Sequence, residues 1–237
     1  MRHRQRFLIT GTGAGVGKTT VGCALGFALR ARGMRVGVMK PVETGCAEID
    51  GALKPRDADA LALAAGCILP LELICPYRYR SPLAPAAAAG IDRLPPPDLA
   101  NIARCFGEIA KDNDVVLVES AGAIVAPITR GSDFADLAAM LVLEVIVVVE
   151  NRPGCVDATM LTIQRCESRG LEVAGYILLR LRSRRLIRDR GQRGLAQAAT
   201  RGFLPGPDAP SRASGQDNCG KAPLMRHVGA WQLVLIS

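Results

Sequence analysis

Along the first three quarters of the chain, short runs of Val, Ile and Leu alternate with segments whose apolar residues recur every three or four positions. Such runs are typical of buried strands, and the longer spacing is typical of helices. Strands are expected at residues 7–10, 35–42, 114–120, 144–150 and 172–179, and helices from about 18, at 57–66 and 99–111, from about 134, and at 156–168. Nearly continuous apolar strands joined by helices predict a three-layer α/β fold, with a mostly parallel sheet covered on both faces.

The alternating pattern fades after residue 180. Residues 203–223 are rich in Pro, Gly and Ser and predict a linker or disorder, while the final WQLVLIS is either a strand or a tail. We therefore expect one domain over residues 1–180 and a divergent, arginine-rich and partly disordered region over 181–237.

Composition limits where the protein works and what it binds. The eight cysteines contain no C-x-x-C pair, which argues against a zinc site or a disulfide framework and favours reduced thiols. The N-terminus runs directly into the first strand without a signal sequence, and the longest apolar run is too short to span a membrane, so a cytoplasmic protein is expected.

The net charge of +8 is unevenly distributed, with seven arginines between Arg180 and Arg193. Such a cluster could follow a nucleic-acid backbone, but it could equally be a solvated, arginine-biased helix or loop. Because only 4% of the residues are aromatic, a surface that stacks bases is not evident, and we do not expect a nucleic-acid partner.

The segment GTGAGVGKT, residues 11–19, joins the first expected strand to the first expected helix. Its glycines let backbone amides approach a polyanion, the Lys18 ammonium suits the outer phosphates, and the Thr19 hydroxyl suits Mg²⁺. Thr12 stands where the usual pattern has its first glycine, so the loop is one residue longer than usual. The expected nucleotide contacts in this loop are Gly13, Ala14, Gly15, Val16, Gly17, Lys18, Thr19 and Thr20.

Further charged residues lie where expected strands end or a helix begins. Lys40 ends the second strand, Glu119 ends the strand at 114–120, and Asp57 and Asp59 open the next helix. Ligands of parallel α/β sheets bind at the carboxyl ends of the strands, so Lys40 should share an anionic group with Lys18. Glu119 and one of the two aspartates should complete an Mg²⁺ shell with Thr19. A surface lysine, helix caps and a partner of an arginine are the alternatives.

The segments GTGAGVGKT, KPVETG, DADALAL, PYRYRSPLAP, VESAGA with APITRGSDFADL, and NRPGCVDATMLT resemble the dethiobiotin synthetase family in order and spacing. The resemblance covers residues 6 to about 179. It implies a P-loop NTPase fold, a homodimer, and an ATP- and Mg²⁺-dependent ligase that closes a cyclic urea from 7,8-diaminopelargonic acid and CO₂ in biotin biosynthesis.

The resemblance also implies roles for individual residues. Lys18 and Lys40 would be catalytic, and Thr19, Asp59 and Glu119 would hold Mg²⁺ and the nucleotide phosphates. Asp59 rather than Asp57 follows from matching residues 59–63 to the family motif. The substrate contacts implied are Thr12, Lys40, Thr44, Ser81, Pro82, Gly122, Pro153, Gly154 and Cys155, with the last three supplied by the neighbouring subunit.

Several positions depart from the family pattern. Gly13-Ala14 replaces an Asp-Thr pair, and Ser120 and Ala123 each replace a glycine. Leu179 replaces the asparagine that reads adenine, which implies weak discrimination between bases. Two other functions therefore compete with an active synthetase. One is a catalytically weakened nucleotide-binding relative. The other is an ATPase switch of the kind that partitions plasmids or positions the division site, although its signature lysine is missing at Gly13.

Overall fold

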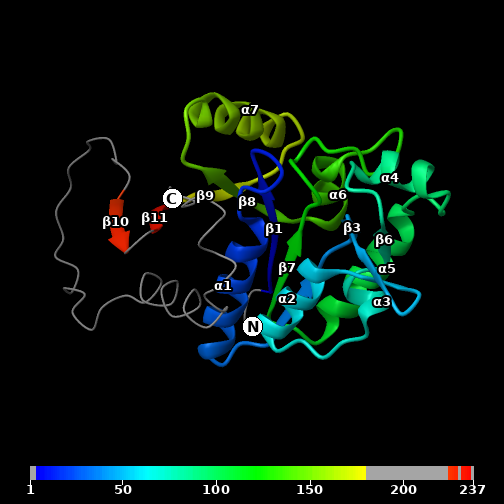
Figure 1. The fold of residues 1–237 in the computed structure, drawn as a ribbon. Helices are drawn as coiled ribbons and strands as arrows, with labels where there is room; N and C mark the ends of the chain where they lie inside the picture. The colour runs from blue at the N-terminus through cyan, green and yellow to red at the C-terminus, as the bar shows by residue number, and fades with distance from the viewer. Residues whose placement is uncertain (1–3, 180–223, 229–230, 236–237) are drawn as a thin grey trace, which may run out of the picture.

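The computed structural model describes residues 4–179, 224–228 and 231–235 (Figure 1). Its elements are, in chain order, β1 (Gln5–Gly11), α1 (Lys18–Ala31), β2 (Val36–Met39), β3 (Val42–Thr44), β4 (Ala47–Ile49), β5 (Ala52–Lys54), α2 (Arg56–Ala65), α3 (Leu71–Ile74), β6 (Tyr77–Tyr79), α4 (Pro85–Asp92), α5 (Leu99–Lys111), β7 (Val115–Glu119), α6 (Phe134–Leu141), β8 (Glu144–Glu150), α7 (Cys155–Glu167), β9 (Val173–Leu179), β10 (Leu224–Val228) and β11 (Trp231–Leu235).

The central sheet has the order β10-β11-β9-β8-β1-β7-β2. The five strands from β9 to β2 are parallel, and β11 and β10 add to the β9 edge in antiparallel pairing. This arrangement confirms the predicted α/β fold with a mostly parallel sheet. It also shows that the final apolar run forms a strand, β11, instead of a tail.

Alternate strand residues supply two separate cores, which is why both faces of the sheet are covered. Leu8 of β1 belongs to the core that includes Ile102 and Phe134, from α5 and α6. Its neighbour Ile9 points to the other face and belongs to the core that includes Leu25 and Leu61, from α1 and α2. The period-two geometry of a strand sends successive side chains to opposite faces. The predicted three layers are therefore confirmed.

The expected strand at 35–42 is wrong in one respect, because the structure divides it at Lys40 and Pro41. β2 ends at Met39, and β3 pairs with β6 in a separate two-stranded parallel sheet. Proline has no N–H to donate to a ladder, and the Lys40 amide bonds to the carbonyl of Ile74 at 2.7 Å instead. The chain thus leaves the central sheet where the site residues begin.

The sequence analysis did not anticipate several short elements. They are α3, α4, β6 and the β4–β5 hairpin, each of at most eight residues. Segments this short contain too few apolar positions to show a period. The expectations for residues 181–223, including the arginine cluster after Arg180, lie outside the described residues, and the proposed domain boundary stays a prediction.

Two further expectations concern the whole chain. The seven cysteines in the described ranges are all free thiols, and four of them are buried. Within the same ranges no helix is both long enough and apolar enough to cross a bilayer.

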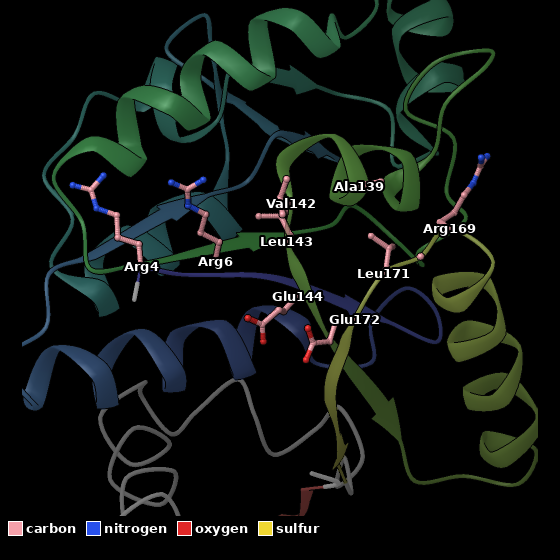
Figure 2. Close-up of a pocket in the computed structure, with 10 residues that line it drawn as sticks. Arg4, Arg6, Ala139, Val142, Leu143, Glu144, Arg169, Leu171 and Glu172 are labelled. Carbon is pink, nitrogen blue, oxygen red and sulfur yellow. The ribbon is translucent and has the colours of Figure 1, made fainter. Parts of the chain in front are cut away.

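A hollow of about 560 Å³ lies at the amino ends of the strands, opposite the glycine-rich loop (Figure 2). We call it the amino-end hollow; it is lined by Arg4, Arg6, Ala139, Val142, Leu143, Glu144, Arg169, Gly170, Leu171 and Glu172. The Arg6 guanidinium stacks over the Phe106 ring at 5.5 Å, and Arg169 bonds Asp136 at 2.8 Å. Figure 2 shows Arg4 and Arg6 on one side of the hollow and Arg169 on the other, so the three guanidinium groups do not converge.

Candidate active site

The glycine-rich loop connects β1 to α1 at the carboxyl end of the sheet. Gly15 and Gly17 have φ angles of 71° and 98°, a left-handed conformation that side chains disfavour. Gly17 occupies the N-cap of α1, which has neither a side-chain cap nor an acidic residue in its first turn. The helix therefore presents uncompensated N–H groups and its positive dipole end to this loop, which suits an anion.

Lys18 begins α1 and is only 7% exposed. Its ammonium donates a hydrogen bond of 2.9 Å to the carbonyl of Gly13, within the loop. The structure thus brings the predicted phosphate-binding lysine and the loop backbone together. Val16 is buried in the core beneath, whereas Ala14 and Gly15 are exposed at the loop surface.

Lys40 and Glu119 form the centre of a buried polar cluster next to this loop. Lys40, 3% exposed, donates to Glu119 Oε1 and, at 2.9 Å, to Asp57 Oδ2. Glu119 Oε1 also accepts a 2.9 Å hydrogen bond from the Thr19 hydroxyl. We call Lys18, Thr19, Lys40, Asp57 and Glu119 the lysine–carboxylate cluster.

The two lysines of the cluster have opposite electrostatics. Burial, and next the charge of Lys40, lowers the pKa of Lys18 to about 8. Burial acts to lower the pKa of Lys40 too, but the charges of Glu119 and Asp57 outweigh it and raise that pKa above its ordinary value. Lys40 therefore stays charged over the neutral range, whereas the ammonium of Lys18 loses its proton more easily, and an anion such as phosphate would stabilise its charged form.

The cluster's donors fit Mg²⁺, which prefers oxygen ligands and usually keeps substrate phosphates in its shell. Glu119 is 1% exposed, and its Oε2 has no hydrogen-bond partner among the described residues. A buried carboxylate oxygen left in this way is costly unless a cation or donor joins it. In the described ranges, no group of three or more His, Cys, Asp or Glu side chains is placed to hold a metal ion by itself. The phosphates of a nucleotide would therefore have to supply further ligands.

The structure places Asp57, and not Asp59, against Lys40. Asp57 bonds Lys40, whereas Asp59 is exposed and outside the cluster. A helix turns about 100° per residue, so side chains two positions apart face nearly opposite directions. The sequence match at residues 59–63 could not show which of the two aspartates the start of α2, at Arg56, turns toward Lys40.

Glu43 is a buried site residue that sequence reasoning missed. It lies in β3 within the KPVETG segment and is 5% exposed. Its Oε1 accepts from the Asp57 amide at 2.9 Å and its Oε2 from the Ala58 amide at 3.0 Å. Desolvation raises its pKa, although these two hydrogen bonds oppose the change. The feature of the sequence that could have indicated this role is the position of Glu43, a charged residue only three positions after Lys40.

Three predicted substrate contacts lie together where β3 and β6 end. The β3–β6 pairing places Thr44 opposite Tyr79, and the amide of Gly45 donates to the Ser81 carbonyl at 3.2 Å. A Cβ on Gly45 would lie 3.3 Å from Pro82 Cβ, so the two turns touch. Thr44, Ser81 and Pro82 therefore lie in one neighbourhood, and their contact with substrate stays a prediction.

Asp92, at the end of α4, organises the loop that contains Ser81. Its carboxylate accepts from the Arg80 amide at 2.5 Å and from the Ser81 amide at 3.0 Å. It also accepts from the Ser81 hydroxyl at 2.5 Å. The Ser81 hydroxyl is thus already bonded within the loop.

The remaining predicted contacts lie at the same edge of the sheet or on an exposed turn. Thr12 follows β1, and Gly122 follows β7 with a left-handed φ of 92°. Pro153 and Gly154 are exposed and Cys155 is half-buried where α7 begins. This turn is outside the lysine–carboxylate cluster.

The departures from the family pattern have structural counterparts. Ser120 is fully buried; its hydroxyl shares a 3.0 Å hydrogen bond with that of Thr10 and bonds the Gly122 carbonyl at 2.9 Å. Leu179 is 1% exposed and belongs to the same core as Val16 of the glycine-rich loop. The Leu179 side chain is therefore part of the core and offers no polar group to a base.

A parallel sheet, a glycine-rich loop opening a helix, and a buried lysine–carboxylate cluster at the strand ends define a P-loop nucleotide-binding protein of the α/β class. A family described as an AAA domain matches residues 5–203. The ATP-dependent dethiobiotin synthetase BioD of Anaeromyxobacter sp. (strain K) is 44% identical over 172 residues, covering 73% of this chain and 75% of that protein. Its counterpart in Anaeromyxobacter dehalogenans (strain 2CP-C) has the same identity and coverage. The chain belongs to the dethiobiotin synthetase family.

Among solved structures, the kinase domain of Escherichia coli tyrosine kinase ETK is similar with a TM-score of 0.47 and 17% identity. That similarity covers 77% of this chain and 69% of the other.

Proposed function

We propose that this protein is an ATP-dependent dethiobiotin synthetase of biotin biosynthesis, a cyclo-ligase that forms a cyclic urea from 7,8-diaminopelargonic acid and CO₂ and releases ADP and phosphate. The observation that carries the proposal is the buried cluster of Lys40, Glu119 and Thr19 beside Lys18 and the glycine-rich loop. It occurs in a chain that is 44% identical to enzymes with that name.

The proposed reaction has three steps. One substrate amine adds to CO₂ and loses a proton, giving a carbamate. A carbamate oxygen attacks the γ-phosphorus of ATP, so the bond to ADP breaks and a carbamic-phosphoric anhydride forms. The second amine then attacks the carbamoyl carbon and loses a proton. The new carbon–nitrogen bond closes the ring, and phosphate leaves as its bond to the carbamoyl carbon breaks.

Every step gathers negative charge, which is what the cluster is suited to receive. Phosphoryl transfer needs positioning and charge neutralisation more than covalent chemistry by the protein. Lys18 would hold the nucleotide phosphates from the start of α1, and Lys40 would face the transferred phosphoryl group and the carbamate. Thr44 would hydrogen-bond the carbamate or the amine, next to the loop of Ser81 and Pro82.

The residues that would hold Mg²⁺ are Thr19, Glu119 and Asp57, with Asp57 in place of Asp59. When bound, the ion would neutralise charge on the phosphates. The unpaired Glu119 Oε2 and the Lys40-bound Asp57 carboxylate support this choice. Asp57 is partly exposed, with 43% of its side chain accessible, so it can turn toward a ligand without uncovering the core.

A homodimer that works in the cytoplasm completes the proposal. α7 presents three exposed apolar side chains, Val156, Met160 and Leu161, next to the turn at 153–155. Apolar residues grouped on one exposed helix favour contact with a partner subunit. Such a contact would carry the 153–155 turn to the substrate carboxylate in the neighbouring site.

Fixation of labelled bicarbonate tests the proposed function. With ATP, Mg²⁺ and 7,8-diaminopelargonate, the protein should convert label into an acid-stable product, and the Lys18→Ala variant should not. Nucleotide hydrolysis without fixation would favour the ATPase switch. Tight nucleotide binding without hydrolysis or fixation would favour a catalytically weakened relative, the possibility that Ala14 and Ala123 keep open.

A further inference from the structure

Helix α2 begins without a cap of its own. Its N-cap is Pro55, whose side chain accepts no hydrogen bond. In most helices a Ser, Thr, Asp or Asn at this position would satisfy the amides of the second and third residues. Here those amides belong to Asp57 and Ala58, and Glu43 accepts from both.

We propose that Glu43 is a positioning residue: from β3 it caps α2 and thereby holds the Asp57 carboxylate against Lys40. The inference rests on the proposed function for its catalytic meaning. Its structural content, that one buried carboxylate fixes the start of α2, rests on the two hydrogen bonds alone.

The position of Glu43 gives this cap a consequence that a local cap would lack. Glu43 lies three residues after Lys40 on the segment that leaves the central sheet, and 14 residues before Asp57. Its carboxylate therefore ties the segment that bears Lys40 to the helix that bears Asp57. A serine at the N-cap would order α2 without fixing its start relative to Lys40.

A series of hydrogen bonds connects Asp57 to the rest of the lysine–carboxylate cluster. Asp57 accepts from Lys40 at 2.9 Å, Lys40 donates to Glu119, and Glu119 accepts from Thr19 at the start of α1. Asp57 is the most exposed carboxylate of this series, with 43% of its side chain accessible, whereas Glu119 is 1% exposed. Lys40 and Glu119 are held in place by burial, whereas Asp57 is held in place by the start of α2, which Glu43 fixes.

The test compares Glu43→Ala with three further variants. Glu43→Gln keeps the shape but offers one acceptor oxygen for two amides. The double variant Glu43→Ala with Pro55→Asp supplies a local cap from the N-cap position. Glu48→Ala is the matched control, because Glu48 is a nearby exposed glutamate whose partner is Arg80 on the surface.

Hydrogen exchange gives a readout that does not depend on turnover. In Glu43→Ala the amides of Asp57 and Ala58 should exchange at least about tenfold faster than in the wild type, since hydrogen bonds to a charged acceptor are lost. Glu43→Gln should lie between the two, and Glu48→Ala should match the wild type. Unchanged exchange in both Glu43 variants would overturn the proposal.

The Mg²⁺ requirement gives the functional readout. The Mg²⁺ concentration for half-maximal ATP binding, followed by calorimetry, and for half-maximal turnover should rise about 10- to 100-fold in Glu43→Ala, the usual effect of losing a group that orients a metal ligand. The KM for the diamine should change less than about twofold. The added Pro55→Asp change should restore the exchange protection but not the wild-type Mg²⁺ requirement, because a local cap does not tie α2 to the segment that bears Lys40.

Two results separate positioning from other roles. If the double variant recovers the wild-type Mg²⁺ requirement together with slow exchange, a local cap is sufficient, and the proposed tie between α2 and the segment of Lys40 is wrong. If Glu43→Ala does not fold, the same comparison is made with Glu43→Gln and its Pro55→Asp double variant. If wild-type protein fixes no bicarbonate, the proposed function fails, while exchange and Mg²⁺-dependent ATP binding still decide the role of Glu43.

Discussion

The two ends of the parallel sheet both carry charged residues, but they use them differently. At the carboxyl ends, the ammonium of Lys40 and the carboxylate of Glu119 are almost fully buried and bond each other. At the amino ends, the amino-end hollow of about 560 Å³ contains Arg4, Glu144 and Glu172, none of them fully buried. The charged side chains of this hollow are therefore less buried than Lys40 and Glu119 of the lysine–carboxylate cluster.

The difference shows that the convergence of buried charges marks chemistry here better than the volume of a hollow does. Burying an ion is expensive unless a partner compensates it. In the lysine–carboxylate cluster, buried ions of opposite charge compensate each other where the strand ends meet the start of α1. At the amino ends Arg169 bonds Asp136 and Arg6 stacks on Phe106, so these arginines hold helices in place.

The largest effect is expected when Lys40 is removed from the carboxyl-end site. Lys40→Ala should lower kcat by at least about a hundredfold, about 3 kcal/mol, because a preorganised charge acts mainly on the transition state. ATP affinity with Mg²⁺, measured by calorimetry, should change less than about tenfold. The control is Lys111→Ala, which removes an exposed lysine paired with Glu108. Near-normal turnover by Lys40→Ala would remove the cluster from the mechanism.

The second test separates the two aspartates of α2. Asp57→Asn should raise the Mg²⁺ concentration for half-maximal turnover about 10- to 100-fold, because it removes a carboxylate proposed to hold Mg²⁺. Asp59→Asn serves as the matched control and should change it less than about twofold, since Asp59 is exposed and outside the cluster. The reverse order of effects would restore the assignment made from the sequence.

The third test concerns pH. The pKa of Lys18 is lowered to about 8 by burial and by Lys40, and bound phosphates should raise it because they stabilise the ammonium. Binding should therefore take up protons near pH 8. Affinity should be complete at lower pH and fall by up to about tenfold per pH unit above 8.

Calorimetry in two buffers that differ in ionisation enthalpy measures this proton uptake. At about pH 6 the uptake should vanish, because a group with a pKa near 8 is already protonated there. Equal binding enthalpies in both buffers at pH 8 would show that the Lys18 ammonium is fully charged before nucleotide binds.

A smaller effect is expected at the loop of Ser81 and Pro82, the proposed substrate contacts. Asp92→Ala removes the acceptor for the amides of Arg80 and Ser81, so the KM for the diamine should rise about three- to tenfold through lost positioning. The KM for ATP should be unchanged. Asp98→Ala, which removes a similar amide acceptor at the start of α5, is the control. An equal rise in both KM values would mean that the loop supports the whole site.

The smallest effect is expected at the amino-end hollow. Arg6→Ala should leave kcat and both KM values within about twofold, and lower the free energy of unfolding by about 0.5 to 1 kcal/mol through the lost contact with Phe106. Steady-state kinetics and denaturant titration measure these. A tenfold loss of activity would show that the two ends of the sheet are coupled.

Much of this architecture follows from local sequence. The helix at 99–111 and the strand at 144–150 have the predicted bounds, because each has a strong period over its whole length. The glycine-rich loop was equally readable, since Gly15 and Gly17 are needed for local backbone reasons. The strand-end rule then placed Lys40 and Glu119 near Lys18 without knowledge of any contact.

What the sequence by itself determined is therefore the sheet, the phosphate loop and the edge at which the chemistry gathers. Tertiary structure alone decided that Asp57 faces Lys40, that β3 separates from β2, and that Glu43 caps α2 from another element. The physical reason is the distance along the sequence over which each feature is determined. Periodicity and backbone strain are encoded within a few neighbouring residues, whereas the direction of a helix's first turn depends on a carboxylate 14 residues earlier in the chain.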